Sequence, residues 1–436
     1  MTIARTIRRF TLLVVSVGLA LPSFSQSGTN SPYSQYGWGV MSDQTSGFNR
    51  GMNGIGIGLR DSRQVNFLNP ASYSAMDSLM FLFDGGVSGH ITQMKEGGNS
   101  ISRKNANFEY AVAGFRVARH LGVSIGIIPY TNVGYSYATT LPIGESSTYT
   151  YTNTYTGSGG LRQVYAGIGW EPLRGLSIGM NAAYMWGDYE KWVVNSYSDK
   201  YTNTLSKLYR ADVSTYQLGF GLQYAARITS KDNLTLGLTY TMGHKMEADP
   251  TCIITSTNSQ TGVSDTTRFE INEKVGLPHI FGAGMGWHHG TKWKVGIDYT
   301  LQKWSGVDFP EYKLVNHVPT YSLNPSYFED RHKVNVGGEY CPDMTGRSFM
   351  KRIRYRAGAS YASSYFKVNG KDGPKEVSVS AGVGIPIINN YNNRSILNLS
   401  VQWVRNAASG LLTENTYRLN IGFTFNERWF QKWKFD

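Results

Sequence analysis

The sequence predicts an all-β protein, a 14-stranded antiparallel transmembrane β-barrel with an N-terminal plug segment. Three observations support this fold class: an export signal, apolar and polar residues that alternate with a period of two, and short connections that alternate with long ones. The predicted parts are a signal peptide over residues 1–25, a plug or hatch segment over 26–77 and the barrel over 78–436.

The start of the chain has the features of an export signal. Three arginines precede the apolar run Phe10–Leu21, and small serines follow it before Gln26. This run is too short to span a bilayer, which needs roughly 20 apolar residues, and the pattern is typical of a secretory signal peptide. We therefore expect the protein to be exported.

The composition favours a barrel in the outer membrane. The chain has 29 tyrosines and 49 glycines, and only 17% of its residues are charged. Such barrels carry aromatic girdles at the membrane surfaces and glycines where strands bend. The net charge of +12 falls to +9 without the three arginines of the signal peptide. On an exported protein this charge predicts contact with outer-membrane lipid and lipopolysaccharide, and no nucleic acid partner.

The period of two is clear in several segments. In residues 293–302, for example, Trp293, Val295 and Ile297 alternate with Lys294 and Asp298 among the polar positions. Alternate side chains of a strand point to opposite faces, so each segment has one apolar and one polar face. In a membrane barrel the apolar face contacts lipid and the polar face lines the lumen.

Fourteen segments of this kind are predicted, an even number, as bacterial barrels have. They are residues 78–92, 106–119, 121–138, 161–172, 176–190, 208–228, 234–247, 267–288, 292–305, 330–341, 351–366, 376–388, 395–406 and 414–425. Most connections after even-numbered segments are tight, and most after odd-numbered segments are long, such as 139–160, 191–207, 248–266 and 306–329. Short periplasmic turns and long outer loops place both termini in the periplasm.

A glycine-rich stretch raises the question of phosphate binding. It reads G-x-x-G-x-G-x-G from Gly51 and is followed by Asn-Pro-Ala. The dinucleotide fingerprint needs G-x-G-x-x-G between a strand and a helix, and Leu59 stands where its third glycine belongs. We predict instead a plug motif that bends inside the lumen, with a loose periplasmic tail as the alternative. The motif residues are Gly51, Gly54, Gly56, Gly58, Asp61, Asn69, Pro70 and Ala71.

Two features of the predicted wall have a candidate role. Pro129 and Gly134 on the third strand predict a local break in the wall, because proline cannot donate a ladder hydrogen bond. The break is a candidate lateral opening, and a harmless bulge is the alternative. A second feature is a lumen charge network on strands nine to eleven, which either is a solvated wall or holds the plug through Arg60 and Asp61. Its residues are Lys294, Asp298, Glu339, Arg354 and Arg356.

The sequence contains no residue pattern that indicates an enzyme active site. His288 and His289 are adjacent and lack a carboxylate at metal-ligand spacing, and the other histidines are scattered over different strands. We expect no enzyme activity, no metal and no cofactor. Cys252 and Cys341 are predicted at opposite ends of the barrel, roughly 25 Å apart, and therefore as two free thiols.

The stretch from Arg50-Gly51-Met52 through Asp61 to Asn69-Pro70-Ala71 resembles the hatch of the FadL/TodX family of outer-membrane transport proteins. YFEDRHKVNVGGEY and RIRYRAGASY resemble that family's paired strands near the C-terminus, and the ending with FNERWF resembles its forms in Bacteroidota. The resemblance implies passage of small hydrophobic compounds past the hatch and out through a kinked third strand, which Pro129 and Gly134 match.

PorV-like barrels of the same kind imply an alternative, a non-transporting subunit of an outer-membrane assembly or secretion complex whose partners are other subunits. A transporter should have a continuous apolar route from an outer groove to the break in strand three. A subunit should instead have a sealed lumen and a face for its partners.

Overall fold

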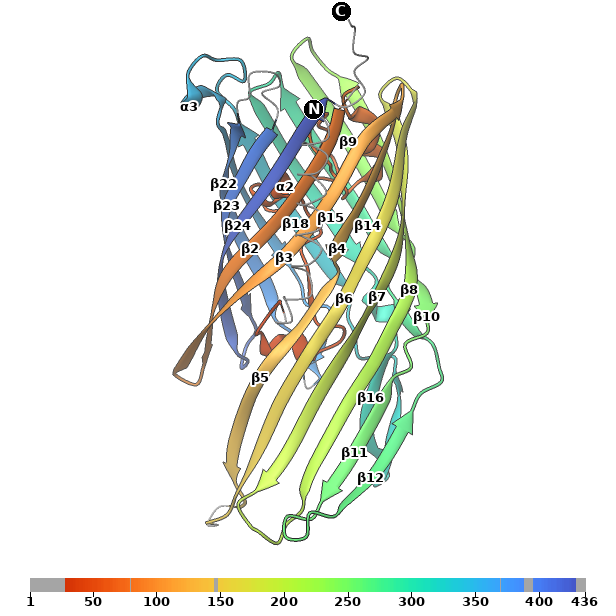
Figure 1. Ribbon diagram of the computed structural model, residues 1–436, viewed down its shortest axis with the longest axis vertical. Coiled ribbons are helices and arrows are strands. Elements are labelled where there is room, and N and C mark those ends of the chain that lie inside the picture. The colour runs from red at the N-terminus through yellow and green to blue at the C-terminus, as the bar shows by residue number, and fades with distance from the viewer. Residues whose placement is uncertain (1–27, 79, 145–147, 369, 388–394, 429–436) are drawn as a thin grey trace, which may run out of the picture.

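The structure is a computed structural model that describes residues 28–78, 80–144, 148–368, 370–387 and 395–428. The predicted signal peptide lies outside these residues, as does the chain beyond Arg428. The described strands form a closed barrel of 14 antiparallel strands, as predicted (Figure 1). Closure occurs between β2 and β24, which pair from Met80 with Arg428 to Lys95 with Thr413.

The wall strands follow the chain in order, with the third strand divided into β4 and β5. They are β2 (Met80–Glu96), β3 (Asn99–Ala118), β4 (Leu121–Pro129) with β5 (Thr131–Pro142), β6 (Thr150–Leu173), β7 (Leu176–Tyr197), β8 (Thr204–Arg227), β9 (Asp232–Thr241), β14 (Ile280–His289), β15 (Trp293–Gln302), β18 (Arg331–Tyr340), β19 (Arg354–Ala362), β22 (Lys375–Ile387), β23 (Ser395–Ala407) and β24 (Thr413–Arg428).

Shorter elements lie inside the barrel or beyond its long-loop end, except for α3, which lies between β18 and β19 at the other end (Figure 1). The strands are β1 (Val40–Met41), β10 (His244–Met246), β11 (Thr251–Thr257), β12 (Ser264–Glu270), β13 (Val275–Leu277), β16 (Phe309–Val315), β17 (Val318–Asn324), β20 (Lys367–Val368) and β21 (Lys371–Asp372). The helices are η2 (Pro32–Gln35), α2 (Gly47–Arg50), η3 (Pro70–Ala75), η4 (Trp304–Gly306) and α3 (Phe349–Arg352). Among the described residues, none of the helices has the length and apolar character that a membrane crossing needs.

The alternating pattern sets the two faces of the wall as predicted. On β15, Trp293 and Ile297 are 45% and 44% exposed on the outer surface, whereas Asp298 is 3% exposed on the inner surface. Large apolar side chains are exposed in the same way on the other wall strands, as expected for a surface that contacts lipid. Polar residues with little exposure face the lumen.

Several predicted strand lengths are wrong, although the positions are right. Residues 139–160 and 191–207, predicted as loops, are largely strand, because β6 begins at Thr150 and β7 continues to Tyr197. These outer parts alternate Thr, Tyr, Ser and Asn, and so lack the contrast between a lipid face and a lumen face. The predicted strand 267–288 is also interrupted, between β12 and β14, where Pro278 cannot donate a ladder hydrogen bond.

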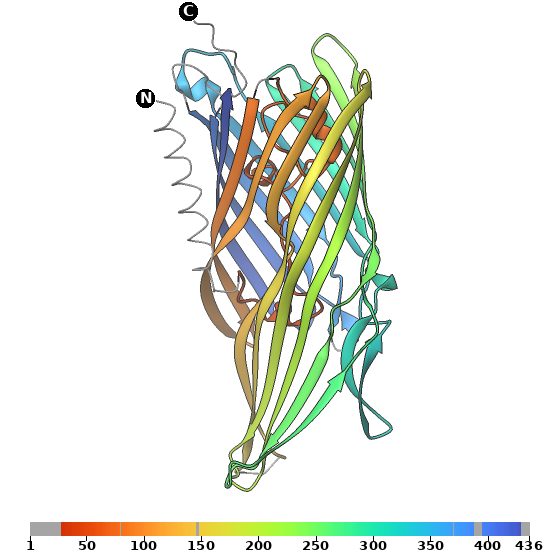
Figure 2. The same ribbon diagram turned by 45° about the vertical axis from the view of Figure 1, so that its right-hand side comes forward.

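The lengthened strands form a sheet that projects beyond the rest of the barrel (Figures 1 and 2). Its strands are β5, β6, β7 and β8, and β11 extends it by pairing with β8 and with β12. The β16–β17 hairpin lies against it, where Tyr321 packs on Tyr209 and on the buried Cys252. Cys252 and Cys341 are both free thiols, as predicted.

Candidate functional site in the N-terminal segment and the inner wall

Residues 28–77, here called the N-terminal segment, lie inside the barrel (Figure 1). None of these residues is exposed, although the segment contains only short helices and the two-residue strand β1. A segment with so little regular structure must satisfy its backbone polar groups elsewhere, since buried N–H and C=O groups are costly when unpaired. The inner wall and the polar side chains of the segment itself provide those partners.

The Asn69-Pro70-Ala71 motif forms the start of η3. Asn69 Oδ1 accepts a hydrogen bond from Ala71 N at 3.1 Å, and Pro70 occupies the first helical position, where no donor is needed. The Asn69 amide also donates to the carbonyl of Ile57 at 3.0 Å and to that of Leu222 on β8 at 3.2 Å. The motif therefore ties its own helix to an earlier part of the segment and to the wall.

The wall beneath η3 carries a row of glycines in lateral register, the first glycine row: Gly122, Gly169, Gly179 and Gly221 on β4, β6, β7 and β8. A β-carbon at Gly122 would overlap the Tyr73 carbonyl, one at Gly169 or Gly179 would overlap Pro70, and one at Gly221 would overlap Asn69. Glycine is therefore required for this close approach of two backbones.

A second glycine row supports the glycine-rich stretch itself. Its members are Gly286, Gly296, Gly337 and Gly358, which pair in lateral register across β14, β15, β18 and β19. A β-carbon at Gly337 or Gly358 would overlap the Met52 carbonyl, and one at Gly286 would overlap Gly58. Gly58 in turn lies against the backbone of Met285, where its own β-carbon would come within 2.7 Å of the Met285 nitrogen. Backbone thus packs on backbone.

The other motif glycines have separate surroundings. Gly54 adopts φ +86°, which glycine accepts without strain. A β-carbon at Gly51 would lie 2.9 Å from Arg356 Cδ, and one at Gly56 would lie 2.8 Å from the Asn49 amide. Asp298 of the predicted charge network accepts hydrogen bonds from Gly56 N at 2.6 Å and Ile57 N at 2.9 Å. It therefore binds the backbone of the segment and, among the described residues, forms no ion pair.

The remaining members of the predicted network surround Asp61. Lys294 contacts Asp61 and lies 3.4 Å from Glu339, and Arg354 lies 3.9 Å from Asp61 and 3.7 Å from Glu339. Arg356 donates to Glu339 at 2.8 Å. Arg60 lies apart from this cluster, because it pairs with Glu171 on β6. We call Asp61, Lys294, Glu339, Arg354 and Arg356 the Asp61 cluster.

The charge on Asp61 suits this position. Burial raises the pKa of its carboxyl, but the neighbouring Lys294 and Arg354 and a hydrogen bond from Arg63 N outweigh burial and hold the pKa below its ordinary value. A carboxyl with a lowered pKa stabilises the folded state above its unfolded pKa, and loses that effect only as the pH falls through the folded value. The Asp61 carboxyl is therefore charged throughout the neutral range.

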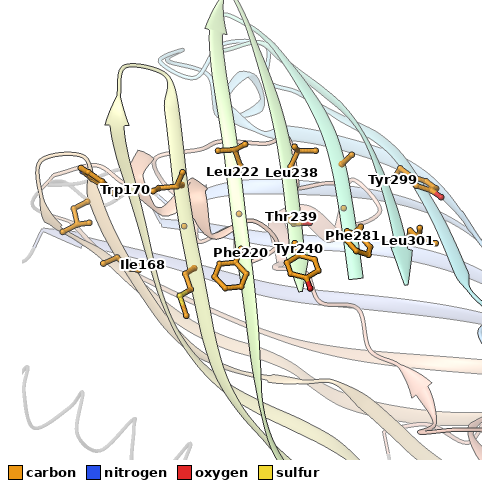
Figure 3. A pocket seen from close by; sticks show the side chains of 17 residues that line it. Ile168, Trp170, Phe220, Leu222, Leu238, Thr239, Tyr240, Phe281, Tyr299 and Leu301 are labelled. Carbon is orange, nitrogen blue, oxygen red and sulfur yellow. The ribbon is translucent and has the colours of Figure 1, made fainter. Parts of the chain in front are cut away.

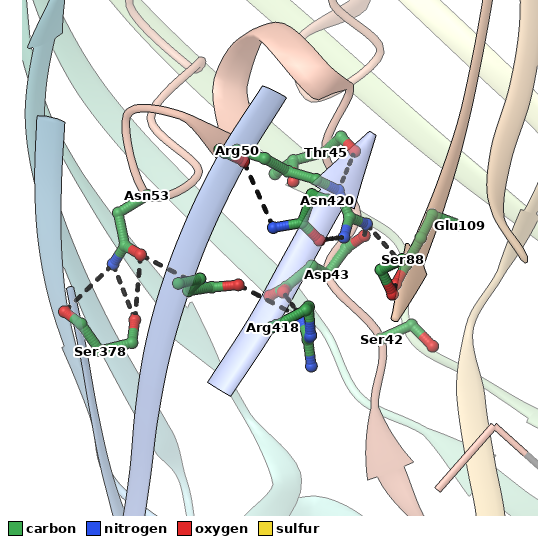
Figure 4. Close-up of polar contacts among 12 residues, drawn as sticks. Ser42, Asp43, Thr45, Arg50, Asn53, Ser88, Glu109, Ser378, Arg418 and Asn420 are labelled. Atoms are coloured by element: carbon green, nitrogen blue, oxygen red, sulfur yellow. Dashed lines mark hydrogen bonds and ion pairs between the residues drawn. The ribbon is translucent and has the colours of Figure 1, made fainter. Parts of the chain in front are cut away.

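A second ion-pair cluster was missed by the sequence analysis (Figure 4). Arg50 pairs with Glu109 on β3 at 2.7 Å and donates to Asn420 on β24 at 3.2 Å, and Asp43 pairs with Arg418 on β24 at 2.6 Å. Glu109 is the one acidic residue of β3. A single carboxylate on the lumen face was the signal from which a buried ion pair could have been predicted. Ion pairs thus hold the segment to β3 and β24 as well as to β15, β18 and β19.

The pairing of the third strand changes between β4 and β5. β4 pairs with β3 as far as Ile127, whereas among the described residues β5 pairs with β6 on one side and with the short β1 on the other. Pro129 lies at the end of β4, and Gly134 lies in β5. Opposite them on β6, Gly159 and Gly160 have φ +122° and +137°, so the neighbouring strand bends at the same level.

The N-terminal segment runs along this part of the third strand and satisfies its backbone. Gln44 donates to the Pro129 carbonyl at 2.7 Å, Ser42 N donates to the Tyr130 carbonyl at 3.0 Å, and β1 pairs with Thr131 and Asn132. Ser34 Oγ accepts from Gly134 N at 3.0 Å and donates toward the Gly134 carbonyl at 3.1 Å. The segment therefore provides the hydrogen-bond partners for the edge of β5 that β3 does not pair with.

Replacing Ser34 with alanine should loosen the segment at β5. Ser34 is fully buried, and its loss leaves the Gly134 backbone groups without a partner, at a cost of about 1–3 kcal/mol. We expect amide exchange at Gly134, measured by mass spectrometry or NMR, to rise about tenfold or more. The matched control is Ser136→Ala, an exposed serine on the same strand. Equal exchange in the two variants would show that Ser34 does not hold the segment to β5.

A space of about 700 Å³ borders the segment at Gln35 and Tyr36, where it faces Tyr327 and the β16–β17 hairpin. Two smaller spaces lie along the segment. One cavity of about 230 Å³ lies between it and the inner wall near Tyr165 and Asn335, and another of about 80 Å³ lies near His90 and Glu414. Ligand pockets usually measure roughly 300–1,000 Å³. In the described part of the chain, no three His, Cys, Asp or Glu side chains form a group that could hold a metal.

A model of the BamG family matches residues 6–436. The chain belongs to the BamG family. A search among curated proteins finds no match. Solved structures with a similar fold are the Ralstonia pickettii toluene transporter TbuX (14% identity, TM-score 0.58, 88% of this chain and 98% of that one) and the Pseudomonas putida toluene transporter TodX (12%, 0.59, 89% and 100%). A Pseudomonas aeruginosa FadL homologue is also similar (11%, 0.56, 88% and 99%).

At these identities the neighbours establish the fold of this BamG family member. The predicted likeness to FadL- and TodX-type outer-membrane barrels is confirmed at that level, and the Bacteroidota form stays a prediction. These neighbours are transporters and channels, and their ligands belong to those proteins.

Proposed function

We propose that this protein is a closed, non-conducting barrel that serves as a subunit of an outer-membrane protein assembly, with its short turns and both termini in the periplasm. The proposal rests on the N-terminal segment, none of whose residues is exposed and whose Ser34, Ser42 and Gln44 form hydrogen bonds with the chain from Pro129 to Gly134. Membership of the BamG family supports it. The sequence alone predicts transport, with this function as the alternative.

The contacts of the segment favour a permanent seal over a movable hatch. Withdrawal would separate Arg50 from Glu109 and Asp61 from Lys294 and Arg354, all at 15% side-chain exposure or less. Leaving one partner of a buried ion pair alone costs about 3–5 kcal/mol. The two glycine rows add backbone packing that would be lost at the same time. A ligand would have to supply differential binding energy of that size to open the barrel.

The projecting part of the molecule offers a surface for partners. The tip of the β16–β17 hairpin carries Leu314, Val315 and Val318 at 66%, 51% and 60% exposure. The hairpin is joined to the long-loop end of the barrel, beyond the apolar band of the wall, so lipid does not cover this tip. An apolar group of this kind on a projecting hairpin is typical of a contact with another protein.

Passage of small hydrophobic compounds is the second candidate. It is favoured by the change of pairing between β4 and β5 at Pro129 and by a fold shared with hydrocarbon channels. In this mechanism the plug motif would move, and the compound would leave sideways between β3 and β5. The segment would then have to release Ser34 and β1 from the edge of β5.

A flux measurement separates the two candidates. The purified full-length protein is placed in liposomes, and entry of a labelled monoaromatic hydrocarbon or long-chain fatty acid is followed. We expect the same rate as in liposomes without protein, because the segment lies in the lumen and covers the edge of β5. Faster entry that the Ser34→Ala variant increases further would favour transport and contradict the proposed function.

A further inference from the structure

A hollow in the lipid-facing wall and a pocket at the long-loop end differ in what surrounds them. The hollow is lined by apolar and aromatic side chains such as Phe220, Leu238 and Tyr240, which contact lipid in the membrane (Figure 3). The space of about 700 Å³ at the long-loop end, here called the outer pocket, lies beyond the apolar band of the wall. It is bordered by Gln35 and Tyr36 of the N-terminal segment, by β7 and β8 of the projecting sheet, and by the β16–β17 hairpin (Figure 1).

Aromatic rings form much of the lining of the outer pocket, and packing behind these rings holds them in place. Tyr36 stacks on Phe366 with ring centroids 5.0 Å apart, and Tyr327 packs on Phe309 at 4.7 Å. The other tyrosines of the lining are Tyr189, Tyr209 and Tyr312. Rings that are already ordered bind the flat face of a ligand with little loss of side-chain freedom.

A buried cation also lines the outer pocket. Lys191 on β7 is 8% exposed, and its Nζ lies 4.5 Å from the centroid of the Tyr189 ring and 5.4 Å from that of Phe309. Nζ donates to the Gly37 carbonyl at 2.8 Å, and an ammonium has further N–H groups beyond that one. Among the described residues, Lys191 has no carboxylate partner. A buried charge without a counter-ion is costly, and an anion bound in the pocket supplies one.

The other cations of the lining are already neutralised. Lys313 and Lys367 each pair with a nearby glutamate, at 2.8 and 3.2 Å. Several neutral groups are free in contrast: among the described residues, the amide nitrogen of Gln35 and the hydroxyls of Tyr189 and Tyr209 form no hydrogen bond. These residues therefore offer a ligand one cation together with neutral hydrogen-bonding groups beside aromatic rings.

We propose that the outer pocket binds an acidic saccharide, a pyranose unit that carries a carboxylate or a phosphate. The anion pairs with Lys191, the C–H face of the sugar lies on a tyrosine ring, and the sugar hydroxyls bond to the free polar groups. The volume of about 700 Å³ is within the usual range for small ligands, roughly 300–1,000 Å³. A fatty acid has the charge but leaves the neutral polar groups without partners.

The source of the saccharide follows from the orientation of the barrel. With both termini in the periplasm, as in the proposed function, the outer pocket opens outside the cell, where lipopolysaccharide and surface polysaccharides supply acidic sugars. Binding of a soluble sugar is measured without reference to that orientation or to any partner protein. Failure of the saccharide site is therefore distinguishable from failure of the proposed function.

Saturation-transfer NMR on the full-length protein in lipid nanodiscs tests the proposal. The probes are glucuronic acid, glucose 6-phosphate, glucose and octanoate. We expect at least one of the two sugar acids to bind about tenfold or more tightly than glucose, because a charge-assisted contact with Lys191 is added. Lys191→Met removes the charge and keeps most of the buried side chain, and this variant should bind the acids and glucose equally. The matched control, Lys245→Met at an exposed lysine on β10, should keep the preference.

A second variant covers the case in which Lys191→Met loosens the segment at Gly37. Ser326→Trp adds a ring at an exposed position of the lining and leaves Lys191 in place, so binding of every sugar probe should fall at least several-fold. Displacement of the bound sugar acid by lipopolysaccharide, or by surface polysaccharide freed of lipid, supports the proposal and identifies the source. No preference of wild type for the sugar acids, an unchanged preference in Lys191→Met, unchanged binding in Ser326→Trp, or tighter binding of octanoate than of either sugar acid would each overturn it.

Discussion

Deletion of residues 51–71 is expected to convert the closed barrel into a conducting pore. These residues include the plug motif and the part of the segment that lies on both glycine rows, and their removal empties the middle of a 14-stranded lumen. Barrels of this size are intermediate between small ones filled by their own side chains and open porins. We expect discrete current steps in planar bilayers that the full-length protein does not give.

A control must show that the current comes from the lumen. Shortening the exposed turn between β11 and β12 by residues 259–262 removes chain without touching the segment. This variant should stay silent in the bilayer, as wild type does. If the deletion of residues 51–71 folds, as judged by its strand content and heat-dependent migration on gels, and still does not conduct, then residues 51–71 are not what closes the barrel.

The replacement Glu339→Gln should have the largest effect of any single change in the Asp61 cluster. Glu339 is 3% exposed and lies 2.8–3.7 Å from Arg356, Lys294 and Arg354. Without its charge, three buried cations share Asp61 as their counter-ion, and we expect a loss of about 3–5 kcal/mol in unfolding free energy. Denaturant titration measures the loss, and cleavage by trypsin at Arg60 or Arg63 reports release of the segment.

The matched control is Glu190→Gln on β7. Glu190 also faces an arginine, Arg210, at 3.7 Å, but its side chain is 37% exposed. Exposed pairs contribute about 0–1 kcal/mol, so this variant should unfold and resist trypsin much as wild type does. An equal effect of the two replacements would mean that the Asp61 cluster does not hold the segment.

The wall strands could be located from the sequence because each of them places apolar side chains toward lipid and polar side chains toward the lumen. That division produced the fourteen strands, their faces and the inward position of Lys294, Glu339, Arg354 and Arg356. The outer ends of β6, β7 and β8, at residues 150–160, 191–197 and 204–207, lack this contrast, because they project beyond the rest of the barrel, and the sequence predicts loops there. Strand propensity alone, in residues such as Thr150–Thr156, was the weaker signal there.

The candidate site could be predicted only in part. Asn69 and Asp61 stood out through their motif, but their partners depend on the path of a segment with almost no regular structure. The members of the glycine rows could be assigned to the lumen face from the sequence, since they fall on polar-face positions of their strands. They include Gly179, Gly221, Gly337 and Gly358. Their lateral alignment requires the register between strands, which a single sequence does not specify. Arg50 and Glu109 likewise meet only through that path.

The central claim, a sealed barrel that serves an outer-membrane assembly, is tested most directly by quantitative affinity purification. The full-length protein carries a tag on an exposed outer turn and is extracted from its native membrane in mild detergent. We predict outer-membrane proteins in stoichiometric amounts, reduced when Leu314 and Val318 at the hairpin tip are replaced by aspartate. Recovery of the barrel alone, with a hydrophobic compound bound in its lumen, would contradict the account.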